Sequence, residues 1–109
     1  MHELAIAESV VSTVLARTGD HRVTTVRVRV GRLAGVVPDA LTFCFELATA
    51  GTSLEGALLE IATDDARGYC RDCEQEIVLP DTLLLCSCGS ADVHLVSGGE
   101  LTVSSVEVA

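Results

Sequence analysis

Tryptophan and lysine are both absent from the 109 residues, and aromatic side chains make up only 3% of them. Since 49% of the residues are nonetheless hydrophobic, the core must be built from Val, Leu, Ala and Ile. No apolar run approaches the ~20 residues that a membrane span needs. The first residues carry Glu3 and Glu8 and no basic stretch, so no secretory signal is expected. We therefore expect a cytoplasmic protein without a membrane partner.

Positive charge is also scarce, because seven bases stand against sixteen acids and the formal net charge is −9. Such a surface repels phosphate backbones, which argues against nucleic acid and favours cations or a basic protein face as partners. The sequence holds no Ser/His/Asp set, no glycine-rich phosphate loop and no matched carboxylate pair. A chain of this length forms one compact unit with a small appendage. We expect a protein that is not an enzyme and is a monomer or weak dimer.

Hydrophobic periodicity predicts a small α+β fold. Apolar residues recur at helical spacing over 4–17 and 38–50, and the second helix is apolar on most sides and is expected to pack deeply. Alternating patterns predict strands at 22–30, 57–63 and 101–108. Opposite-charge pairing between neighbouring strands is expected to occupy the arginines of the first strand. The fold is thus two helices on one face of a three-stranded sheet.

Four cysteines gather in the stretch YCRDCEQEIVLPDTLLLCSCGS, as Cys70-x-x-Cys73 and Cys86-x-Cys88. Two close pairs on a short connection offer four thiolates from two tight turns, which suits tetrahedral Zn²⁺. Between the pairs, 77–79 and 83–85 are expected to form a hairpin around a turn at Pro80 and Asp81. The pattern predicts a zinc ribbon.

Two other chemistries fit paired cysteines, and both stay open at this stage. Disulfides would need an oxidising compartment, and a redox dithiol normally opens a helix, which no pattern after Cys73 suggests. The second pair also has one spacer residue where a ribbon turn usually has two. His94 is the nearest substitute ligand if one thiolate does not reach the metal.

The cysteine lobe interrupts the α+β domain in the sequence. We expect a discontinuous domain of residues 1–66 and 98–109, with a zinc-binding ribbon domain at 67–97 inserted in it. The fifth cysteine, Cys44, lies on an apolar helical stripe and is expected to be a small core residue.

The first three residues offer a second kind of metal chemistry. The α-amine of Met1, the backbone nitrogen of His2 and the imidazole Nδ1 of His2 can close fused five- and six-membered chelate rings. Nitrogens arranged in a plane suit Ni²⁺ or Cu²⁺ better than Zn²⁺. Glu3 could supply a fourth donor. These residues are expected to form an exposed lead-in to the first helix.

Over its whole length the sequence resembles the HypA/HybF family of hydrogenase-maturation nickel chaperones. The resemblance rests on MHELAIAESV at 1–10, VRVRVGRLAGVVPDALTFCFELATAGT at 26–52, the paired cysteines, and CGSADVHLVSGGELTVSSVEVA at 88–109. The MHE start, the inserted lobe and the GGEL…VEV closing strand are its most specific features.

The resemblance implies a nickel metallochaperone with a structural zinc site. Ni(II) would be carried on Met1, His2 and Glu3, and Zn(II) held by four ligands, Cys70, Cys73, Cys86 and Cys88. The implied partners are the GTPase HypB and the large subunit of [NiFe]-hydrogenase. Two alternatives are a zinc-ribbon protein-interaction adaptor that transfers no nickel, and a thiol oxidoreductase that uses Cys70 and Cys73.

Overall fold

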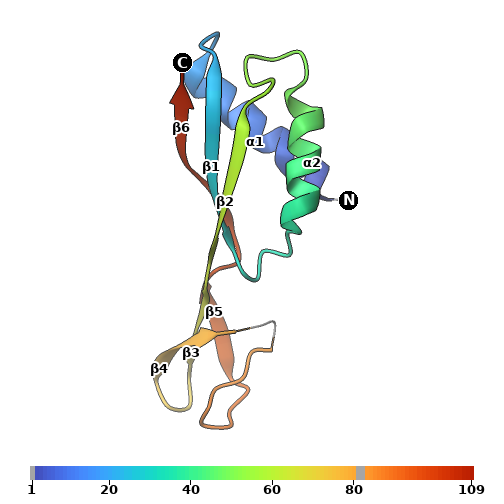
Figure 1. Cartoon of the computed structure of the whole chain (residues 1–109). Coiled ribbons are helices and arrows are strands. Elements are labelled where there is room, and N and C mark those ends of the chain that lie inside the picture. Colours follow the sequence, from blue (N-terminus) through green and yellow to red (C-terminus); the bar gives the residue numbers. More distant parts are fainter. Residues whose placement is uncertain (1, 81–82) are drawn as a thin grey trace. The chain divides into compact units, whose positions relative to one another are not determined.

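The computed structural model describes residues 2–80 and 83–109. The described elements are, in chain order, α1 (His2–Thr18), β1 (Val23–Gly31), α2 (Pro38–Thr49), β2 (Leu58–Asp64), β3 (Ala66–Cys70), β4 (Gln75–Leu79), β5 (Val93–Ser97) and β6 (Leu101–Val108) (Figure 1). They form two three-stranded sheets, with strand orders β2-β1-β6 and β4-β3-β5. The predicted α+β class with an inserted cysteine lobe is confirmed.

The chain divides into two compact units. The first comprises residues 1–28, 36–62 and 103–109, and the second comprises 29–35 and 63–102. The predicted functional division, with a zinc domain at 67–97, stays a prediction. Within residues 2–80 and 83–109, no helix is long and apolar enough to cross a membrane.

The core of the first unit forms between the two helices and one face of the sheet. Along β1, Val26 and Val28 are fully buried, whereas Arg27 between them reaches the other face. There Arg27 Nε donates to Glu60 of β2 over 2.8 Å, and the same guanidinium pairs with Glu107 of β6. The expected opposite-charge pairing across neighbouring strands is confirmed, although exposed pairs of this kind add little stability.

Helix α2 is less buried than its composition predicts. Pro38 stands at the first helical position, where its missing N–H group removes no intrahelical hydrogen bond. Leu41 and Phe45 are buried at a four-residue spacing, but Phe43 and Leu47 are exposed. The expectation of a helix packed on most sides is wrong, because this unit has one sheet and one other helix to cover it.

The second unit is organised around β3. Strand β3 pairs antiparallel with β4 through a register that runs from Ala66↔Leu79 to Cys70↔Gln75, and antiparallel with β5 on its other side. Its buried residues form a small apolar cluster with Leu79, Cys86 and Val93.

The internal hairpin of this lobe differs from the predicted one. The strand 77–79 exists within β4, but its partner is β3, and residues 83–85 form no strand. Asp81 of the predicted turn lies outside the described residues. The prediction failed for two reasons. The three leucines at 83–85 have the composition of a strand but do not form one. Strand β3 was not expected, because Arg67 and Gly68 weaken its apolar alternation.

Two glycines permit a close backbone crossing in the second unit. A Cβ atom on Gly31 would lie 2.1 Å from the carbonyl oxygen of Gly98, and one on Gly98 would lie 2.4 Å from the Cα of Ala66. The Leu33 N–H group donates to the Gly98 carbonyl over 2.9 Å at the same crossing. Only residues without a side chain allow these segments to approach so closely.

Candidate metal centres

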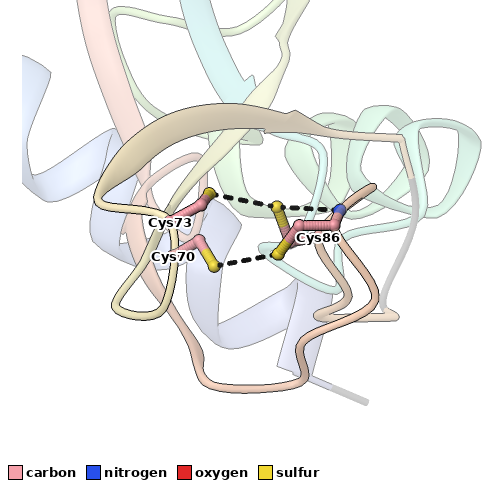
Figure 2. Close-up of side chains that lie close together, drawn as sticks. Cys70, Cys73 and Cys86 are labelled. Atoms are coloured by element: carbon pink, nitrogen blue, oxygen red, sulfur yellow. Dashed lines mark hydrogen bonds between the residues drawn. The ribbon is translucent and has the colours of Figure 1, made fainter.

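The four paired cysteines come together in the second unit. Their sulfur atoms all lie within 4.8 Å of one another, and none of the four forms a disulfide. Cys70 Sγ is 3.7 Å from Cys88 Sγ, and Cys73 Sγ is 3.7 Å from Cys86 Sγ. Figure 2 shows the side chains of Cys70 and Cys73 directed from one turn toward the turn that carries Cys86.

Two tight turns present these thiols. The first follows β3, and Glu74 just after it adopts a left-handed backbone with φ of 57°. The second is closed by hydrogen bonds from Cys86 N–H to the Ser90 carbonyl and from Gly89 N–H to the Cys86 carbonyl, each 2.9 Å long. Gly89 has a φ of 93°, a left-handed backbone that glycine adopts without strain.

The shortened spacing of the second pair still brings both thiols to the cluster. The N–H group of Cys88 lies 3.5 Å from Cys86 Sγ, so the tight turn provides a backbone donor to sulfur. Cys86 is buried whereas Cys88 is exposed. One spacer residue therefore places one thiol in the apolar cluster and the other at the surface.

Polar side chains outside the cluster connect the two turns. Ser90 Oγ donates to the carboxylate of Asp72 and accepts from the Asp92 N–H group. Arg71 pairs with the Asp92 carboxylate over 2.8 Å, and its N–H group donates to the Asp92 carbonyl. These contacts fix the position of one turn against the other, which is how outer residues of metal sites orient the ligands. Sequence reasoning missed them, because Asp, Ser and Arg near cysteines are equally common as solvated loop residues.

The thiol pKa values reflect this crowding. Donation from the Cys73 N–H group is the main cause that lowers the pKa of Cys70 to about 7. The hydrogen bond between the Cys73 and Cys70 side chains is the main cause that raises the pKa of Cys73 to about 12. One thiol therefore loses its proton readily, and the negative charge of that thiolate opposes deprotonation of the neighbouring thiols. A bound divalent cation would offset this repulsion between thiolates.

The donor set fits a tetrahedral metal. Zinc–thiolate bonds of about 2.3 Å require sulfur atoms roughly 3.8 Å apart along each edge of the tetrahedron. The two 3.7 Å separations match this edge. All four donors are soft sulfurs, which exclude a preference for Ca²⁺ or Mg²⁺.

His94 lies on the other face of the sheet. It pairs with Tyr69 across β3 and β5, whereas Cys70 pairs with Val93. Neighbouring positions of a strand point to opposite faces, and the rings of His94 and Tyr69 are accordingly 5.5 Å apart. His94 is therefore separated from the sulfur cluster by the β3 backbone, and the structure brings four thiols together without it.

Two other predicted metal residues, His2 and Glu3, lie in the first unit. Met1 lies outside the described residues. Helix α1 begins at His2, so the expected exposed lead-in is wrong: His2 and Glu3 belong to the first helical turn. The His2 side chain is 51% exposed, whereas Glu3 is buried. His2 Nδ1 is 3.5 Å from Glu3 Oε2, so two predicted nickel donors face each other.

Glu3 has a second contact that sequence reasoning missed. The Val37 N–H group, just before α2, donates to Glu3 Oε2 over 3.1 Å. This hydrogen bond is the main cause that lowers the pKa of Glu3 below its usual value. No sequence signal could have found the contact, because its donor is a backbone group 34 residues away.

Comparison with known proteins gives consistent matches over the whole chain. Residues 1–108 match the family model described as "HypA: Hydrogenase/urease nickel incorporation, metallochaperone, hypA". A protein named hydrogenase maturation factor HypA from Geotalea uraniireducens is 46% identical over 109 residues, 99% of each chain. One of the same name from Nostoc punctiforme is 39% identical over 108 residues, 99% of this chain and 96% of the relative.

Solved structures support the fold. The solution structure of the Ni metallochaperone HypA from Helicobacter pylori matches with a TM-score of 0.72 over 99% of this chain and 97% of that one. At 21% identity, this match concerns the arrangement of helices and strands only.

Proposed function

The chain belongs to the HypA family of nickel-incorporation metallochaperones for hydrogenase maturation, and from this premise we propose that it binds Ni(II) at Met1, His2 and Glu3. It would deliver the ion to the large subunit of a [NiFe]-hydrogenase, together with the GTPase HypB, in the cytoplasm. Members of this family carry metal ions, and a carrier releases the ion chemically unchanged.

One observation carries the proposed nickel site: His2 Nδ1 and Glu3 Oε2 lie 3.5 Å apart in the first turn of a helix. The first N–H groups of a helix have no intrahelical acceptor. The backbone nitrogen of His2 can therefore lose its proton to a metal without breaking the helix. Together with the α-amine and the imidazole, it would supply three nitrogens in one plane, which suits Ni²⁺.

The exposure of His2 suits delivery. A carrier must hold its cargo firmly, yet let a receiving site replace the ligands one at a time. The imidazole stands at the surface, while Glu3 behind it is held by Val37. A receiving protein would displace the imidazole first.

We propose that Cys70, Cys73, Cys86 and Cys88 hold Zn(II) in a structural role. The ion would neutralise the thiolates and link the two turns. The residues around them support this role, since Asp72, Ser90 and Asp92 already hold the turns together through polar contacts. Full coordination by protein sulfurs leaves no open position for a substrate.

The nickel proposal is tested by calorimetric titration of Ni²⁺ into three zinc-loaded proteins. They are the protein with an authentic Met1, the same protein with an N-terminal extension of four glycines, and His2→Ala. The extension turns the Met1 amine into an amide and moves the new amine away from His2, but it keeps every side chain. We expect both altered proteins to lose nickel affinity to a similar degree while zinc content stays the same.

Equal affinity of the extended and authentic proteins would exclude a site anchored by the amine. Absence of nickel binding in all three would favour the alternative function, a zinc-ribbon adaptor that binds proteins without transferring nickel. The exposed Phe43 and Leu47 of α2 are apolar surface that such an adaptor could use.

A further inference from the structure

A groove in the first unit lies between the C-terminal half of α1 and strand β6. Its volume is about 330 Å³, within the range of sites that hold small ligands or short peptide segments. The groove is lined by Thr13, Val14, Arg17 and Thr18 of α1 and by Val103, Ser104, Ser105 and Val106 of β6. Neither metal proposal uses any of these residues.

One wall of the groove is an edge of the sheet. In the order β2-β1-β6, strand β6 has β1 on one side only, as Figure 1 shows. An edge strand presents backbone N–H and C=O groups to any extended chain beside it. Leu101–Val108 contains neither proline nor lysine, the residues that commonly block such edges. Its half-buried Val103 and Val106 add apolar surface to the groove.

The other wall carries a positive charge. Six of the seven arginines have hydrogen-bond or ion-pair partners among the described residues. Arg17, at the rim of the groove, has none among residues 2–80 and 83–109. In a chain of net charge −9, a guanidinium that no internal carboxylate engages marks where an external carboxylate is best received.

We propose that the groove between α1 and β6 binds an extended acidic segment of a partner protein, which adds to the sheet at β6 and places a carboxylate on Arg17. Main-chain hydrogen bonds to the edge strand would supply affinity, and a helix beside the edge would select the side chains of the segment. Alternate residues of the segment point toward the groove. Val14, Val103 and Val106 favour small apolar side chains there.

A second copy of this chain fits the groove less well. Two copies that paired through their β6 edges would each need to offer a carboxylate to the other's Arg17. Glu107 is the acid within β6, and it is already paired with Arg27. This docking site does not depend on nickel or zinc binding.

The test uses a synthetic peptide and the zinc-loaded, ¹⁵N-labelled protein. The peptide is six residues long, acetylated and amidated, with alternating threonine and valine and one central aspartate. Titration should shift the amide resonances of β6 and of the last two turns of α1. Arg17→Glu should weaken binding at least about tenfold, and a peptide with arginine in place of aspartate should bind this variant better than the original protein.

Two matched controls separate docking from general effects. Arg32→Glu changes the net charge equally, but Arg32 lies in the other compact unit and outside both proposed metal sites, so peptide binding should be unchanged. Thr13→Trp fills the groove and should abolish binding, whereas Ser12→Trp, at an exposed neighbouring position outside the groove, should not.

The proposal is overturned if the shifts fall outside the groove, or if Arg17→Glu and Arg32→Glu weaken binding equally. It is also overturned if sedimentation shows that β6 is covered by a second copy which the peptide cannot displace. Arg17 and Thr13 are both exposed, so the variants should fold, and their amide spectra show whether they do.

Discussion

The N–H group of Val37 donates to Oε2 of Glu3 across 3.1 Å and joins the first turn of α1 to the start of α2. Val37 is not a metal-binding residue, yet it fixes the carboxylate proposed to lie next to nickel. A residue that looks like a ligand in the sequence therefore has a structural role as well. The two roles can be separated by experiment.

The structural role of Glu3 predicts a specific pH dependence. Because its pKa is lowered on folding, ionised Glu3 favours the folded state above its usual value of 4.5, and this stability is lost as the pH falls through the lowered value. Glu3→Gln should lower the melting temperature at pH 7 by about 2–5 °C and by less at pH 3, because the contribution of ionised Glu3 declines once the pH falls below 4.5. Thermal unfolding without nickel, at both pH values, measures this difference.

Acid also removes zinc, and Glu8→Gln controls for that effect, because exposed Glu8 lies on the same helix. The melting temperatures of Glu3→Gln and the original protein could instead differ equally at pH 3 and pH 7. In that case the charge of Glu3 is not what holds Val37.

The cysteine cluster predicts which residues control zinc content. Cys88→Ser should lower the zinc content to well below one ion per chain and loosen the lobe, because only three thiolates remain. His94→Ala should leave zinc content unchanged, since His94 contacts Tyr69 on the opposite face of the sheet. Elemental analysis of the two purified variants decides the matter. Loss of zinc in His94→Ala would show that the histidine replaces a thiolate.

The backbone crossing predicts unequal effects for two glycines of the second unit. Gly98→Ala should cost more than about 3 kcal/mol, because the new Cβ would meet the backbone of Ala66 at 2.4 Å. Gly35 also has a positive φ, but nothing lies within 4 Å of its added Cβ. Gly35→Ala should therefore cost only about 1–2 kcal/mol. Urea unfolding of the zinc-loaded proteins compares them, and equal costs would mean that the crossing can open.

The nickel site predicts a steep loss of affinity in acid. Protons compete with Ni²⁺ for the α-amine and for the backbone nitrogen of His2, so affinity should fall at least about tenfold from pH 7.5 to 6.5. The protein with the four-glycine extension should show a shallower dependence, because its amine is too far from His2 to take part in the chelate. Calorimetry at the two pH values measures both slopes. Identical slopes would contradict coordination by the amine.

Much of the architecture could be predicted because it depends on local patterns. Helical spacing places α1 and α2 to within two residues, and alternation places β1, β2 and β6. Along β6, Val103 and Val106 are half-buried, with exposed Ser104 and Ser105 between them. Two cysteine pairs on short turns were expected to converge, and they do.

What the local patterns could not decide is which segments meet. Three leucines at 83–85 have the composition of a strand, but β3 takes the place beside β4. Strand pairing depends on the whole set of competing partners in the folded lobe. The apolar composition of one segment does not show which other segment it will pair with.

The sequence by itself determined the kind of chemistry: four thiols at metal-binding spacing, and a start of the chain rich in donors for nickel. Only the tertiary structure decided the roles of His94, Glu3 and Arg17. His94 lies on the wrong face for the cluster because strand neighbours alternate, and Glu3 is held by a backbone group distant in sequence. Arg17 borders a groove that exists only when α1 and β6 come together. Each role depends on contacts between residues far apart in the chain, which arise only when packing brings them together.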